Sequence, residues 1–163
     1  KPKLMLAYTY DFNNDASKTR SNMGDYMYLD DGSLYQTNIT TQFIDAVFKY
    51  EGYSLMTEYS SRSATNPIAK ETDGMETGDI VLTGSAINVA MGYFFSKKIE
   101  IAGRWTSLSF DDLSGAESVT MYTLGLNNFI VGHKLKVQSD LSYTLNDGSG
   151  NALMFRTGFE LHF

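Results

Sequence analysis

The sequence lacks cysteine altogether and contains only two prolines and one tryptophan among its 163 residues. Without cysteine there is no disulfide framework and no thiol chemistry. The scarcity of proline argues against a proline-rich, disordered chain. No run of eighteen apolar residues is present, which excludes a helical membrane protein. The net charge of −6 at pH 7 makes nucleic acid an unsuitable partner, because the nucleic-acid backbone is itself anionic.

Aromatic residues are abundant, with eleven Tyr and ten Phe. They suit β-strands and the aromatic girdles of membrane barrels. The chain opens on Lys1-Pro2-Lys3, without an initiator Met or a signal peptide. We therefore expect that a leader has been removed or that the chain is a piece of a longer polypeptide. The length predicts one domain over residues 1–163 and no separate second domain.

Strict alternation of apolar and polar residues is clearest at the carboxy-terminal end, over residues 152–163. A period of two predicts a β-strand with two unlike sides. The same pattern recurs along the chain and predicts eight strands in an antiparallel meander. The other seven are expected over residues 4–12, 43–50, 53–60, 79–95, 99–110, 119–130 and 134–143.

The connections between these strands alternate in length. They are long after the first, third, fifth and seventh strands and short after the second, fourth and sixth. This alternation is typical of transmembrane barrels, which have long outer loops and short periplasmic turns. It predicts that the amino terminus and Phe163 lie at the same, periplasmic edge. Most of the acidic residues fall in the expected outer loops, so we expect an acidic rim.

Three stretches resemble known outer-membrane proteins. Gly158, Phe159, Leu161 and Phe163 resemble the carboxy-terminal assembly signal of bacterial outer-membrane β-barrels. Residues 48–59 and 122–138 resemble hairpins of the phosphate-selective porin O/P family. The resemblance implies an all-β transmembrane antiparallel meander β-barrel, to which this chain contributes eight strands as the carboxy-terminal half of a porin of about sixteen.

The same resemblance implies a function and a location. We expect a porin-type channel in the bacterial outer membrane that allows passive diffusion of small polar solutes or ions. The implied partners are outer-membrane lipid and lipopolysaccharide, the barrel-assembly machinery, and further copies in a homotrimer or larger membrane complex. Anion selectivity in the family depends on a basic constriction in its amino-terminal half, so phosphate is not assigned to this chain.

Charged residues of the strands fall on the face opposite the apolar one. Two interpretations stay open for them: they line a water-filled pore, or they form a packed salt-bridge network inside a closed eight-stranded barrel. The candidate lumen-lining residues are Lys3, Asp45, Lys49, Glu58, Glu100, Arg104, Lys134, Lys136, Asp140, Arg156 and Glu160.

Two other classes of protein share the strand pattern. One is a complete small eight-stranded outer-membrane barrel that serves as an anchor, an adhesin or a structural protein. The other is a soluble lipocalin-like barrel, which would point its apolar face inward and bind an apolar ligand. The distinguishing features are the size of the native polypeptide and its need for detergent.

The remaining candidate sites are weaker. The first long connection contains three tyrosines among acidic residues: Tyr26, Tyr28 and Tyr35. Three interpretations stay open for this segment: a constriction folded into the lumen, a docking site for a partner, or an ordinary surface loop. The two histidines have no metal-ligand spacing, and the acidic loops lack calcium-loop spacing. No serine is selected by a neighbouring base. We therefore predict no enzyme activity, no cofactor and no metal.

Overall fold

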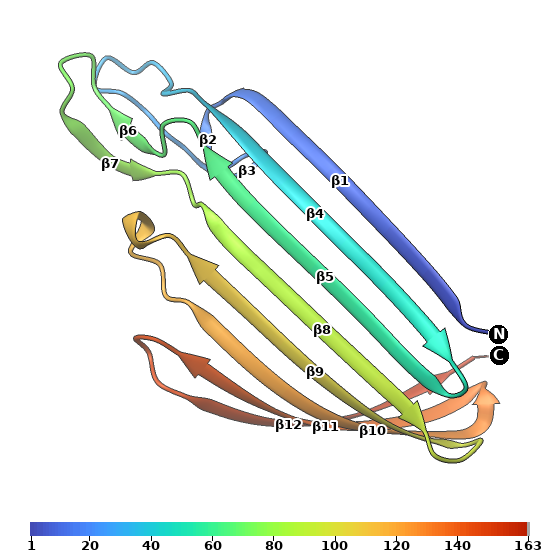
Figure 1. Cartoon of the computed structure of the whole chain (residues 1–163). Coiled ribbons are helices and arrows are strands. Elements are labelled where there is room, and N and C mark those ends of the chain that lie inside the picture. The colour runs from blue at the N-terminus through green and yellow to red at the C-terminus, as the bar shows by residue number, and fades with distance from the viewer. Residues whose placement is uncertain (163) are drawn as a thin grey trace.

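The structure is a computed structural model that describes residues 1–162, apart from the side chain of His133. Eight strands form one antiparallel sheet in the order β1-β4-β5-β8-β9-β10-β11-β12 (Figure 1). The order in the sheet is the order along the chain, so the sheet is a meander, and the short strands with the skipped numbers lie outside it. These strands are β1 (Lys3–Ala16), β4 (Thr37–Tyr50), β5 (Tyr53–Ala64), β8 (Gly84–Phe94), β9 (Ile99–Phe110), β10 (Val119–His133), β11 (Leu135–Asn146) and β12 (Ala152–Leu161). The predicted all-β antiparallel fold is thereby confirmed.

The helical content is a single 3-10 turn, η1 (Asp112–Ser114), within the described range. Across residues 1–162, no helix has the length and apolarity needed to cross a membrane.

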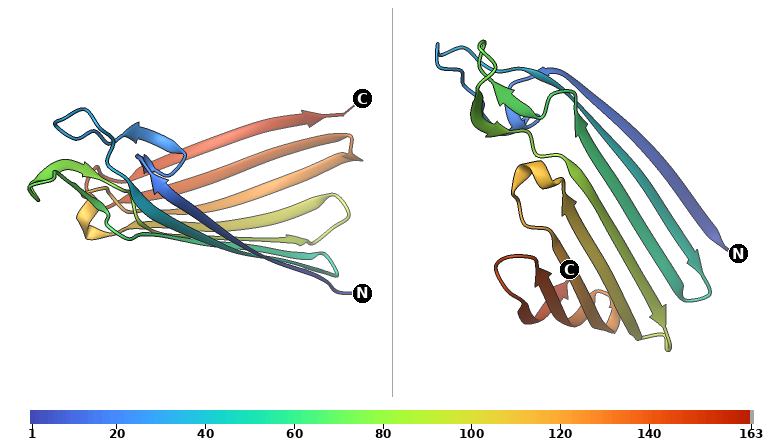
Figure 2. Two further views of the ribbon diagram at one scale, coloured as in Figure 1. Left: turned by 90° about the horizontal axis from the view of Figure 1, so that it is seen from above. Right: turned by 60° about the vertical axis from the view of Figure 1, so that its left-hand side comes forward.

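The sheet is curved and open. Strand β1 pairs only with β4, and β12 pairs only with β11, so both are sheet edges and the described strands close no barrel. Figure 2 shows the sheet curling into a trough, with both termini at the end that carries the short turns. A complete eight-stranded barrel requires β1 to pair with β12, and this pairing is not formed.

Several predicted boundaries are wrong at the end of the sheet that carries the long connections. The strand expected over residues 79–95 is two elements, because Asp79 and Ile80 belong to β7 (Glu76–Ile80) and residues 81–83 separate it from β8. At the opposite end, Lys134 was expected to begin a strand. It lies instead in the turn before β11, where its N–H donates to the carbonyl of Val131 at 3.0 Å.

Gly84 starts β8 in a conformation that favours glycine, with φ at +144°. A Cβ there would clash with the carbonyl oxygen of Ser109 on β9. We expect Gly84→Ala to destabilise the protein by more than about 1 kcal/mol in denaturant unfolding. Gly32→Ala is the control, since Gly32 has φ +83° but nothing within 4 Å of its added Cβ. Equal losses in the two variants would show that the close contact with β9 contributes nothing.

The first two long connections each contain a short hairpin, which the sequence pattern did not predict. In the first, β2 (Lys18–Arg20) pairs with β3 (Met23–Tyr26). In the second, β6 (Ile68–Lys70) pairs with β7. The two connections also contact each other, because the N–H of Leu82 donates to the carbonyl of Thr19 at 2.9 Å.

A small hydrophobic cluster lies beneath these two connections. Its members come from both connections and from the adjoining strand ends, and all are at most 5% exposed. They are Ala16, Met27, Ile39, Ala69 and Val81. The long connections therefore fold as one packed unit at this end of the sheet.

The three tyrosines of the first connection do not form one cluster. Tyr35 packs against the hydrophobic cluster and donates its hydroxyl to the carbonyl of Asn66 at 3.2 Å. Its burial raises the pKa of its phenol. Tyr26 and Tyr28 are exposed, with ring centroids 6.2 Å apart. Only Tyr35 thus has a structural role in joining the two connections.

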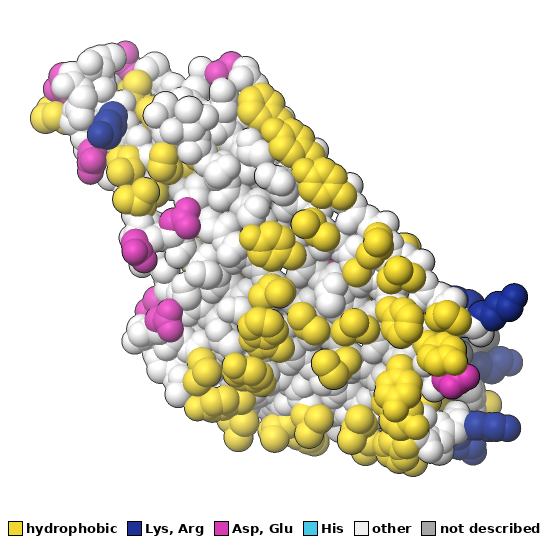
Figure 3. Space-filling model, in the orientation of Figure 1, with side chains coloured by type: hydrophobic (Ala, Val, Ile, Leu, Met, Phe, Trp, Pro, Cys, Tyr) yellow, Lys and Arg dark blue, Asp and Glu magenta, His cyan; other side chains and the backbone are white. Residues whose placement is uncertain are grey.

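The two faces of the sheet differ sharply in chemistry. Directly paired residues lie on the same face, and the register pairs apolar residues with one another across the sheet, as for Ile101 with Leu126 and Leu141 with Phe155. Figure 3 shows the hydrophobic side chains gathered over the convex face of the sheet. Leu6 is 70% exposed and Phe159 is 79% exposed. No second layer covers this face within the described part of the chain.

Aromatic residues of the convex face gather in two zones. Tyr50, Tyr53 and Tyr93 form one register row near the short turns, and the rings of Tyr53 and Tyr93 stack at 4.3 Å. Trp105 and Tyr122 belong to a second row nearer the long connections, which continues to Tyr143. A single register row lies between the two zones; it includes Leu124 and Leu141 and ends in Phe155.

Candidate functional site

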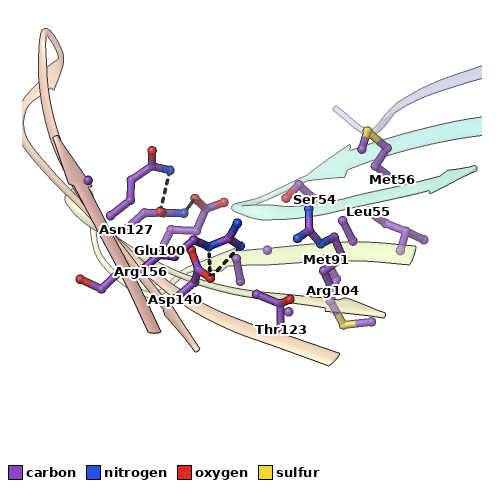
Figure 4. Close-up of a pocket in the computed structure, with 18 of the residues that line it drawn as sticks. Ser54, Leu55, Met56, Met91, Glu100, Arg104, Thr123, Asn127, Asp140 and Arg156 are labelled. Carbon is purple, nitrogen blue, oxygen red and sulfur yellow. Dashed lines mark hydrogen bonds and ion pairs between the residues drawn. The ribbon is translucent and has the colours of Figure 1, made fainter. Parts of the chain in front are cut away.

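The concave face of the sheet holds a groove of about 920 Å³. Residues from β4, β5, β8, β9, β10, β11 and β12 line it, so the groove crosses most of the sheet (Figure 4). Its charged lining residues are Lys49, Glu100, Arg104, Asp140 and Arg156. Alternation brings them together, because each occupies the strand face opposite the apolar residues.

The register gives the place of every candidate lumen residue except Lys134. On the concave face, the directly opposed pairs are Lys3 with Lys49, Asp45 with Glu58, Glu100 with Asn127, Arg104 with Thr123, Lys136 with Glu160, and Asp140 with Arg156. Lys134 is not part of this set, since it lies in a turn.

The carboxy-terminal assembly signal divides between the two faces. Gly158 lines the groove. Phe159 and Leu161 project from the opposite face and are 79% and 55% exposed. Phe163 lies outside the described residues.

Strands β11 and β12 carry complementary charges. Arg156 donates through Nε and Nη2 to Oδ1 of Asp140 at 3.0 and 2.9 Å. Lys136 Nζ lies 2.5 Å from Oε2 of Glu160, whose other oxygen contacts His162 at 2.7 Å. This side of the groove is therefore an ion-pair ladder.

The opposite side of the concave face has like charges in register. Lys3 faces Lys49, and Asp45 faces Glu58. Across residues 1–162, none of these four side chains forms an ion pair with an opposite charge. Glu58 accepts a hydrogen bond from Asn88 Nδ2 at 2.7 Å. Because directly opposed like charges are destabilising, this arrangement favours a hydrated surface, where water and ions screen the repulsion.

We expect Asp45→Asn to stabilise the protein by about 0.2–1 kcal/mol, because it removes the repulsion from Glu58. Asp140→Asn is the matched control, since the same change there removes the carboxylate that pairs with Arg156 and should lower stability. Both effects should shrink in 1 M salt, where the Debye length is about 3 Å. Denaturant midpoints in detergent measure them. A loss of stability in Asp45→Asn would contradict a solvated like-charge pair.

Two arginines near the long connections were missed as candidate site residues. Arg62 was expected in a loop but lies in β5, where its Nε donates to Oγ1 of Thr41 at 3.2 Å. Arg20 lies in β2. For Arg62 a signal existed, because Glu58, Ser60 and Arg62 continue the alternation of the polar face. The position of Arg20 depends on how the first connection folds, and no local sequence pattern indicated it.

The chain shows no match at a significant level to any family model, any curated protein or any solved structure. The two faces of the sheet are therefore the basis for assigning a function. Among the described residues, no group of three or more acidic, histidine or cysteine side chains is placed to hold a metal ion.

Proposed function

We propose that this chain forms part of the wall of an outer-membrane porin-type channel, through which small polar solutes or ions diffuse passively. One observation carries the proposal: the convex face is apolar and uncovered, while the concave face holds a charged groove. A membrane channel needs this arrangement, with lipid outside and water inside.

The convex face supports a lipid contact. Soluble monomers rarely expose contiguous apolar patches larger than a few hundred Å². Here large apolar side chains stay exposed on all eight strands of the sheet, from Leu6 on β1 to Phe159 on β12. The aromatic residues of this face, such as Tyr93 and Trp105, also suit a membrane barrel, whose interfaces are rich in aromatic rings.

The direction of curvature argues against a soluble ligand-binding barrel. Such a barrel turns its apolar face inward to enclose its ligand. The groove of this sheet instead carries charged residues, such as Lys49, Glu100 and Arg104, beside its apolar ones. The like-charge pairs, including Asp45 with Glu58, also argue against a packed salt-bridge network inside a closed barrel, because such a network needs neighbouring side chains of opposite charge.

The proposal requires further strands to close the ring. The unpaired edges β1 and β12 expose backbone donors and acceptors that cannot remain unsatisfied in lipid. The resemblance to porins of about sixteen strands supplies a suitable arrangement, with the remaining strands contributed by the rest of a longer polypeptide. A homotrimer or larger complex in the bacterial outer membrane belongs to the same proposal.

Reconstitution of the native polypeptide into planar lipid bilayers tests this function. We expect stepwise ohmic conductance, extraction from membranes only with detergent, and a polypeptide mass more than about twice that of this chain. A freely soluble monomer would overturn the proposal, and so would a membrane-inserted protein with no conductance. A native mass equal to that of this chain would overturn the interpretation that the chain is half of a larger barrel. The need for detergent would then decide whether the protein inserts into the membrane.

A further inference from the structure

A second, smaller cavity of about 260 Å³ lies at the end of the trough that carries the long connections. Arg20, from the β2–β3 hairpin, lines it together with residues of β4, β5, β8 and β9. The hairpin thus folds over the concave side of the sheet, as seen from above in Figure 2. The hydrogen bond from the Leu82 N–H to the Thr19 carbonyl holds it there.

The charge of this cavity is positive. Its lining includes both Arg20 and Arg62 but no carboxylate. Within residues 1–162, neither arginine forms an ion pair with an acidic side chain. Arg62 uses Nε to bind Thr41, which orients its guanidinium and leaves the terminal nitrogens without a carboxylate. A guanidinium matches the two oxygens of a carboxylate.

The lining is also partly apolar. Phe43, Leu82, Leu108 and Phe110 contribute to it beside the two arginines. An inorganic anion would satisfy the arginines but leave these side chains in water. A ligand with an apolar body would cover them as well, and the cavity lies just below the roughly 300–1,000 Å³ range of drug-sized sites. The suitable ligand is therefore small.

We propose that this cavity binds a small organic carboxylate with an apolar body the size of one ring or a short acyl chain. The carboxylate lies between the guanidinium groups of Arg20 and Arg62, and the apolar body packs against Phe43 and Leu108. The site goes beyond the channel function, and binding to it does not require conductance. A failure of binding is therefore distinguishable from a failure of the channel proposal.

The test is calorimetric titration of the detergent-solubilised full-length protein with sodium benzoate. We expect saturable binding, with inorganic phosphate and benzyl alcohol each at least about tenfold weaker, because each satisfies only half of the lining. Arg20→Gln and Arg62→Gln should each weaken benzoate by about tenfold or more, as expected for loss of a charge-assisted pair. Lys70→Gln makes the same charge change on the exposed β6–β7 hairpin and should leave the affinity unchanged.

Several results would overturn the proposal. If benzoate affinity is unchanged in both arginine variants, the guanidinium groups do not bind the carboxylate. Phosphate or benzyl alcohol binding as tightly as benzoate removes the need for a carboxylate joined to an apolar body. The Trp105 fluorescence spectrum reports folding on the opposite face. Arg20 is exposed and lies outside the large sheet, so Arg20→Gln keeps the test decisive if Arg62→Gln fails to fold.

Discussion

Lysine in place of Leu6 is expected to destabilise the membrane-inserted protein by up to about 2–4 kcal/mol, the cost of a cation on a lipid-facing strand at the middle of the bilayer. Leu6 is 70% exposed on the convex face, between Leu4 and Tyr8 on β1. Denaturant unfolding in lipid vesicles measures the loss. The reason is that lipid cannot solvate the ammonium group, which must reach the interface or distort the bilayer.

Ala7→Lys is the matched control for Leu6→Lys. Ala7 is the next residue of β1, lies on the concave face and is paired directly with Asp45. A lysine there gains water and an acidic neighbour, so we expect little change in stability. Similar losses in the two variants would contradict the assignment of the convex face to lipid. A milder loss for Leu6→Lys than for Ala7→Lys would indicate that water, rather than lipid, contacts the convex face of β1.

Truncation of Met27 is expected to separate the two long connections. Met27 is fully buried in the small cluster with Ile39, Ala69 and Val81. Removing a buried side chain of this size costs about 2–5 kcal/mol, which is large for so small a cluster. Met27→Ala should therefore speed proteolytic cleavage and hydrogen exchange throughout residues 17–36 and 65–83.

Met23→Ala supplies the comparison for Met27→Ala. Met23 belongs to the same connection but is 73% exposed, so its truncation should leave both protection patterns unchanged. The strands of the large sheet should keep their slow exchange in both variants. Loss of protection in β9 or β10 after Met27→Ala would show that the connections and the sheet unfold together.

The sequence predicted the large sheet because each strand carries its own local signal. Residues 99–106 alternate after the Ser96–Lys98 turn, the acidic Asp111 marks the next loop, and β9 spans Ile99–Phe110 as predicted. The faces were also predictable, since a period of two needs no tertiary information. The ends nearest the long connections were missed, because Asn13 to Ala16 and Thr37 to Gln42 are polar or small except for Ile39 and give no alternating apolar pattern.

The folding of the long connections depends on contacts between distant residues. Met27 meets Ala69 and Val81 only after two connections have come together, and no local pattern encodes this. The inward position of Arg20 follows from the same packing. Sequence alone therefore predicted residues that line the groove, because they alternate along strands. It did not predict the smaller cavity, because the lining of that cavity includes a folded hairpin.

The even number of strands in the open sheet restricts how its ring is completed. Neighbouring strands alternate in direction, so the first and the eighth, β1 and β12, run opposite to each other. Whatever bridges these two edges while keeping every neighbour antiparallel must contribute an even number of strands. A bridging segment with an odd number would force one parallel contact into the ring. In the proposed ring, the directions of β1 and β12 therefore determine the parity of the additional strands.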